Sequence, residues 1–286
     1  MVVFRPLSPH EQNLAGSLLP VETGREVLVL QVSGSVAIRE PIKSDCHLLL
    51  VVEEGAEATV CLEVSAAHFD CEVIVRDGAR LSIVTIQEGE HCTIRQRSSI
   101  GAGAELHWHN VSLGAELSQT LLSEVTGDHA TSSIDWISYV RGTEKQQLSA
   151  HNLFSVPNGR GEIHMRSVAE ERGQAAQRGM IEIGLKGTGT DTYLTQEVLM
   201  LDRTAKVDAI PALEIRTNDV KASHSASVSR LTEEDLFYFS ARGIPEEEAR
   251  TMYIEGFLAG ATDSIESPEI RELVRGRIEH KYRAGR

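Results

Sequence analysis

The chain has 286 residues, of which 41% are hydrophobic and 5% aromatic, with 23 glycines and a formal charge of −14. This length allows one large domain or two small ones, and the glycine-rich, aromatic-poor composition favours a turn-rich β architecture over a helix bundle. The acidic balance argues against nucleic acid and anionic membranes as partners, because both repel negative charge.

The first 24 residues form a proline-containing N-terminal segment that we expect to be irregular. It lacks the continuous apolar region of a signal peptide, and the chain has no run of about 18 apolar residues for a membrane helix. We therefore expect a cytoplasmic protein. The four cysteines, Cys46, Cys61, Cys71 and Cys92, form no CxxC pair, so small buried free thiols are favoured over a metal site.

Residues 25–228 are predicted to form a β-rich core. Short β-branched runs follow one another there, and many alternate apolar and polar residues as half-buried strands do. These runs cover residues 26–32, 35–40, 47–52, 58–64, 71–76, 80–86, 92–100, 105–113, 116–125 and 132–140, and strand character returns over 181–202 and 212–229.

Glycine turns separate the predicted strands, and Gly55, Gly78 and Gly101 lie 23 residues apart. A fixed period of this length indicates stacked coils that share one core. A parallel β-helix satisfies this pattern. A two-sheet sandwich also gives short strands at about 8–12 residue spacing, but the period favours the β-helix.

Residues 229–286 are predicted to form a C-terminal helical domain. Thr232 and Asp235 fit a helix cap with reciprocal hydrogen bonds, and Gly243 suits the end of that helix. Pro245 opens a second helix with three glutamates in its first turn, and Ser267 precedes a third.

Two histidines offer the clearest metal-like spacing. His107 and His109 lie two residues apart in a predicted strand, so both imidazoles share one face while Trp108 points to the other. No third ligand is identifiable from spacing, so structural or surface histidines remain the simpler interpretation. His151, His164 and His224 are isolated, and a structural or exposed role is the default for each.

Hydrolase and nucleotide-binding motifs are missing from the sequence. No GxSxG motif accompanies the serines near His224, and the glycines of residues 184–191 lack the GxxxxGK[ST] order of a phosphate loop. Four consecutive large apolar residues, Leu236 to Phe239, cover more than one face of the first predicted helix. They indicate either ordinary packing or a docking face for a partner.

The stretch NDVKASHSASVSRLTEEDLFYFSARGIPEEEARTMYIEGF, residues 218–257, closely resembles the SufB/SufD family of iron–sulfur cluster assembly proteins. Residues 187–215 also match that family's pattern, and the resemblance is strong over about residues 178–260. It implies a right-handed parallel β-helix with a C-terminal helical domain, mainly β overall. It further implies a complex with a SufC-type ABC ATPase docked on the helical domain.

The resemblance also assigns surfaces. The ATPase docking candidates are Leu236, Phe237, Tyr238, Arg242, Gly243, Ile244, Met252 and Phe257. The late β-helix strands would pair with a SufB-like protomer or a second copy of the chain, and the interface candidates are Pro211, Glu214, Asp219, Val220 and His224.

The chain departs from the family at its cluster-binding positions. Ala205 and Ala222 replace cysteines, and Ser225 replaces the acid that follows the histidine in SufB-type members. Only His224 remains as a metal or cluster ligand, and an imidazole alone is a poor cluster cage. We therefore expect a non-catalytic, SufD-like scaffold or partner subunit, with no tightly bound cofactor in the isolated chain and iron or a cluster held only transiently in the complex.

Four alternatives stay open from the sequence. His224 could be purely structural. The chain could be a homodimeric SufB-like scaffold that itself assembles the cluster, or a stand-alone homodimer that retains the fold without cluster work. A β-helix carbohydrate-active enzyme is the rival from another class, but it requires a carboxylate pair in a cleft.

Overall fold

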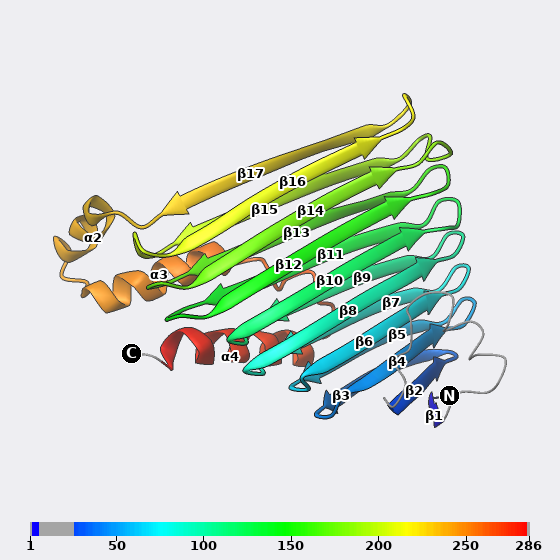
Figure 1. Cartoon of the computed structure of the whole chain (residues 1–286), viewed down its shortest axis with the longest axis horizontal. Helices are drawn as coiled ribbons and strands as arrows, with labels where there is room; N and C mark the ends of the chain where they lie inside the picture. The colour runs from blue at the N-terminus through cyan, green and yellow to red at the C-terminus, as the bar shows by residue number, and fades with distance from the viewer. Residues whose placement is uncertain (1, 6–25, 285–286) are drawn as a thin grey trace.

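The computed structural model describes residues 2–5 and 26–284, and most of them form a parallel β-helix of two sheets (Figure 1). From β2 onward, consecutive strands alternate between the sheets, so each coil contributes one strand to each. Sheet A runs in the order β1 (Val2–Arg5), β2 (Glu26–Val32), β4 (Cys46–Val52), β6 (His68–Val75), β8 (His91–Ile100), β10 (Glu116–Val125), β12 (Lys145–Phe154), β14 (Gln174–Ile183) and β16 (Lys206–Ile215). Sheet B runs in the order β17 (Lys221–Arg230), β15 (Asp191–Met200), β13 (Arg160–Ala169), β11 (Thr131–Val140), β9 (Glu105–Ser112), β7 (Arg80–Gln87), β5 (Glu57–Val64) and β3 (Ser35–Ile42).

The predicted β-helix is confirmed, and the sandwich alternative is wrong because neighbouring strands pair in parallel. Strand β1 is the exception, since it pairs antiparallel with β2. Its four residues correct the expectation of an irregular N-terminal segment, and the remainder of that segment lies outside the described residues. Strands β12 and β13, most of β14 and residues 206–211 of β16 were not among the predicted runs.

The constant period predicted from the glycines holds only for the early coils. Ser35 on β3 pairs with Glu57 on β5, whereas Ala175 on β14 pairs with Val207 on β16, at a much larger separation in sequence. The coils therefore lengthen along the chain while the strands remain in register.

The turn glycines show the same drift. Gly55 and Gly78 occupy the left-handed backbone region, with φ of 65° and 64°. In the next coil this position is taken by Gly103, with φ of 62°, and not by Gly101 as the period predicted.

The core lies between the two sheets. One in-register column of sheet B runs through Val60, Ile83, Trp108, Ile134, Ile163 and Leu194, all fully buried. Other inward positions are polar and hydrogen-bonded, as buried polar groups must be. Trp136 donates from Nε1 to Ser112 Oγ at 2.9 Å, and Asn110 donates from Nδ2 to Gln96 Oε1 at 3.0 Å.

Three helices follow β17: α2 (Glu233–Ser240), α3 (Glu246–Leu258) and α4 (Pro268–Arg283). This confirms the three predicted helices. Helices α3 and α4 cover the outer face of sheet B through a shared apolar cluster that includes Ile254, Val274, Val111 and Ile137. No helix among the described residues is long and apolar enough to cross a membrane.

Ion pairs fasten α4 to the β-helix. Arg277 binds Glu63 at 2.6 Å and Glu88 at 3.1 Å, and Lys281 binds Glu144 at 2.6 Å. The helical region is therefore attached along much of sheet B.

Candidate functional site

The last coil of the β-helix, formed by β16 and β17, is an open end. Each strand is the final member of its sheet, so one backbone edge of each lacks a strand partner among the described residues. Such an edge is a template for pairing with another chain. Ile215 and Val228 face the interior side of this end yet are 41% and 54% exposed.

The structure brings the predicted pairing residues together in this coil. Pro211 and Glu214 lie on β16, Asp219 and Val220 lie in the turn, and His224 lies on β17. Val220 is partly buried against the core, whereas Asp219 and His224 are exposed. All five residues thus share the last coil, while their contact with a partner stays a prediction.

His224 terminates the apolar column of sheet B. It pairs in register with the buried Leu194, so its side chain occupies an inward-facing position. No further coil covers that position among the described residues, and His224 is therefore exposed. An imidazole at this end is available to a partner molecule or a metal ion.

The four thiols lie far from His224 along the solenoid. All are buried, on β4, β5, β6 and β8, as the sequence predicted. Burial raises the pKa of Cys61 to about 11 and of Cys92 to about 12, and it also raises the pKa of Cys71. Since the thiolate is the metal ligand, these groups are poor ligands at neutral pH.

Alanines occupy the two positions where the family resemblance implies a cysteine. Ala205 is buried in a small cluster with Val198 and Met200, and Ala222 packs partly against the core. Among the residues of the last coil, ligand atoms come from His224 and from carboxylates such as Glu214. Glu214 already accepts a hydrogen bond from Arg216 Nε at 2.7 Å.

Helix α2 presents a second candidate surface. The predicted cap is confirmed, because Asp235 N donates to Thr232 Oγ1 at 3.2 Å and Thr232 N donates to Asp235 Oδ2 at 2.9 Å. Helix α2 has no buried residue, and Phe237 and Tyr238 are 71% and 55% exposed. The cap therefore holds an exposed aromatic helix in a defined orientation.

An open groove of about 760 Å³ runs between α2 and α3. Its apolar lining consists of Leu199, Tyr238, Phe239, Met252, Tyr253 and Phe257. Phe239 packs edge-on against Tyr253 at 5.8 Å between ring centroids, and the Arg242 guanidinium lies 3.6 Å above the Tyr238 ring. The lining is thus mostly apolar, with Glu234 and Asp235 as its charged members, and Arg242 stacks on one of its aromatic rings.

The eight predicted docking residues divide by their exposure. Phe237, Tyr238, Arg242, Gly243 and Met252 are exposed. Leu236, Ile244 and Phe257 are partly buried. Gly243 adopts φ of 78°, as predicted for the end of the helix. Phe239, part of the aromatic run but not among the eight candidates, and Tyr253, which the sequence did not single out for docking, both line the groove.

Comparison with known families shows which family the chain resembles over most of its length. The family described as "SUF system FeS cluster assembly, SufBD core domain" matches residues 40–257. The chain belongs to the SufBD family. The matched region includes most of the β-helix, all of α2 and nearly all of α3, so both candidate surfaces of this SufBD chain lie inside it.

Curated relatives carry the same family name. An iron–sulfur cluster assembly SufBD family protein of Mycobacterium bovis is 29% identical over 191 residues, 65% of this chain and 23% of the relative. One of Mycobacterium leprae is 27% identical over 209 residues, 72% of this chain and 24% of the relative. One of Staphylococcus saprophyticus is 28% identical over 216 residues, 74% of this chain and 46% of the relative. The chain thus matches less than half of each relative's length.

Proposed function

We propose that this SufBD chain is a non-catalytic scaffold or partner subunit of iron–sulfur cluster assembly that works in the cytoplasm. It pairs through the open β-helix end and docks a SufC-type ABC ATPase on α2 and α3. The observation that carries the proposal is the exposed aromatic surface of α2 beside an apolar groove, within the region matched by the SufBD family.

The docking half of the proposal rests on the surface chemistry of α2 and α3. Phe237, Tyr238 and Met252 are large apolar side chains that the free chain leaves in water. Aromatic anchors of this kind concentrate the binding energy of protein interfaces. The chain has no phosphate-binding loop of its own, so a partner must supply ATP hydrolysis.

The pairing half rests on the last coil. The unpaired edges of β16 and β17, with Ile215 and Val228 exposed between them, suit a second β-helix end of the same kind. That partner is either a SufB-like protomer or a second copy of the chain. His224 would then lie at the interface, where it offers one imidazole to iron or to a cluster passing through the complex.

The partner-subunit role is favoured over a cluster-building homodimer by the ligand chemistry. A cluster is held by thiolates, and the thiols of this chain are buried and distant from His224. Two identical copies would therefore bring two histidines and no accessible thiolate to the interface.

Co-expression with a SufC-type ATPase and a SufB-like protein tests the proposal. We expect the untagged chain to co-purify with the tagged ATPase in stoichiometric amount. Recovery of the ATPase without the chain would contradict the docking half, and recovery of the chain without the SufB-like protein or a second copy would contradict the pairing half.

A further inference from the structure

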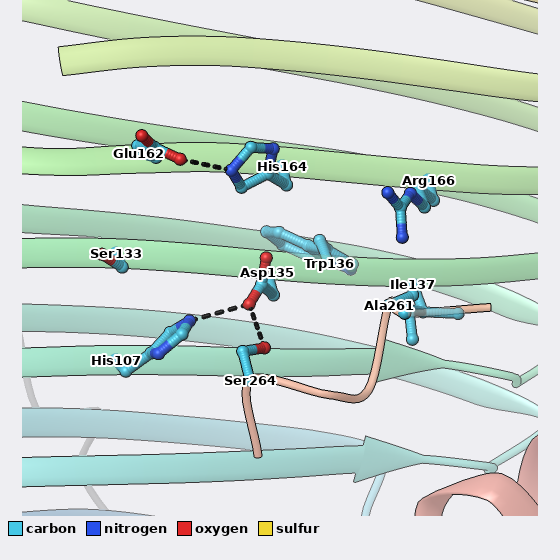
Figure 2. Close-up of a pocket in the computed structure, with 11 residues that line it drawn as sticks. His107, Ser133, Asp135, Trp136, Ile137, Glu162, His164, Arg166, Ala261 and Ser264 are labelled. Atoms are coloured by element: carbon cyan, nitrogen blue, oxygen red, sulfur yellow. Dashed lines mark hydrogen bonds and ion pairs between the residues drawn. The ribbon is translucent and has the colours of Figure 1, made fainter. Parts of the chain in front are cut away.

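The outer face of sheet B carries a histidine pair that the proposed function does not use. His107 and His109 alternate with the buried Trp108 on β9, so both rings share one face, as the sequence predicted, and that face is the outer one. The neighbouring strand β11 places Asp135 directly beside His109 in the register. Figure 2 shows the Asp135 carboxylate between His107 and a serine of the loop that follows α3.

The three side chains converge on a small volume. One ligand atom from each lies within 4.8 Å of the others. Without a metal ion His107 donates from Nε2 to Asp135 Oδ2 at 2.8 Å, a hydrogen bond that an ion bound by both residues would replace, and His109 Nδ1 lies 3.7 Å from the same oxygen. The two imidazole rings are 3.9 Å apart between centroids. Asp135, which belongs to the next coil, is the third ligand that sequence spacing alone did not identify.

His109 is the unusual member of the cluster. Its side chain is 3% exposed, and neither ring nitrogen has a hydrogen-bond partner. Buried polar atoms without a partner are rare and costly. A metal ion at this place would supply the missing partner of one ring nitrogen, since an imidazole nitrogen is a common metal ligand.

Asp135 is oriented by a hydrogen bond from outside the three-residue cluster. Ser264 donates from Oγ to Asp135 Oδ2 at 2.6 Å. Outer hydrogen bonds of this kind fix the orientation of carboxylate ligands in metal sites.

We propose that His107, His109 and Asp135 form a binding site for one divalent first-row transition-metal ion, of the zinc or ferrous type. Two imidazoles and one carboxylate suit these metals, whereas calcium and magnesium prefer all-oxygen ligands. His107 and Asp135 also line a pocket of about 320 Å³ together with Glu162, His164 and Arg166, which leaves room beside them for water or a further ligand.

The site lies at the seam between the β-helix and the helical region. Its ligands come from β9 and β11, while Ser264 belongs to the segment between α3 and α4. A bound ion would offset the negative charge of Asp135. Through the Ser264 hydrogen bond it would also hold in place the segment between α3 and α4. The metal site is independent of the partner-subunit role, since it uses none of the residues assigned to pairing or docking.

Zinc titration of the untagged full chain tests this inference. By calorimetry we expect one equivalent of Zn²⁺ to bind, and X-ray absorption should show nitrogen and oxygen donors without sulfur. His107→Gln and Asp135→Asn should each weaken binding at least 100-fold, and Ser264→Ala about 10-fold, as is typical for outer partners of metal ligands.

The matched control is His68→Gln, because His68 is an exposed histidine paired with Asp45 at 3.0 Å on the same β-helix. It should bind zinc as the parent chain does. His107 is partly exposed, so its variant is expected to stay folded, and metal-free thermal unfolding checks this. Absence of binding in the parent chain, sulfur donors, or unchanged binding in both ligand variants would overturn the proposal.

Discussion

Phe237 offers the sharpest perturbation of the docking surface. It is 71% exposed in the free chain, and a phenylalanine presents about 200 Å². A partner that covers it would bury about 140 Å², which corresponds to at most about 3.5 kcal/mol at roughly 25 cal/mol per Å². Part of this is lost to ordering on association. We therefore expect Phe237→Asp to cost about 2–3 kcal/mol of binding free energy, a factor of about 30 to 150.

The assay is calorimetric titration of a SufC-type ATPase with each purified variant. Because the Phe237 side chain is exposed, the free energy of unfolding of the isolated variant should change by no more than about 0.5 kcal/mol. Leu185→Asp is the matched control, since Leu185 is 79% exposed in the β14–β15 turn at the opposite edge of the β-helix from α2 (Figure 1). Equal affinity for Phe237→Asp and the parent chain would refute the docking assignment.

Two further predictions concern the fold and the thiols. A Cβ on Gly161 would overlap the backbone of Ser132 on the adjacent strand, so Gly161→Ala should destabilise the chain by about 3 kcal/mol or more; Gly276→Ala, on an open face of α4, should stabilise it by about 0.5–1 kcal/mol. Chemical denaturation measures the free energy of unfolding of both variants. Equal changes in the two would contradict the close packing of Gly161 against Ser132. With the pKa of Cys61 raised to about 11, about one thousandth of that thiol is ionised at pH 8, so Ellman's reagent should react slowly with the native chain and promptly with all four thiols in guanidinium. Prompt reaction of one thiol per native chain with Ellman's reagent would show that a thiolate is accessible. A stable iron–sulfur chromophore after anaerobic reconstitution would show the same.

The β-helix was predictable where its inward positions are apolar. Runs such as residues 58–64 and 80–86 supply Val60 and Ile83 to the core column. Strand β12 escaped prediction because its inward positions include Gln146 and Asn152, which are buried but satisfied by hydrogen bonds. Sequence periodicity detects apolar alternation, and it does not detect a polar interior whose partners lie on other coils.

The candidate surfaces likewise contain features that the sequence predicts and features that it does not predict. The cap at Thr232 and the aromatic run of α2 depend on neighbours in sequence, so they could be predicted. The groove partner Tyr253 and the third metal ligand Asp135 depend on contacts between distant segments. The length of each coil determines which residues pair on neighbouring strands. Because the coils lengthen along the chain, a constant period predicts the wrong pairs in the later coils.

The central claim, a partner subunit that pairs through its open end, is tested most directly by native mass spectrometry of the assembled complex. The account predicts that the chain, of 31.3 kDa, enters a pair with a SufB-like protomer or a second copy. Val228→Lys, on the inward side of the open end, should abolish that pair, whereas Ile210→Lys, on the outward side of the same coil, should retain it. A complex in which Val228→Lys pairs as well as the parent chain would contradict the account.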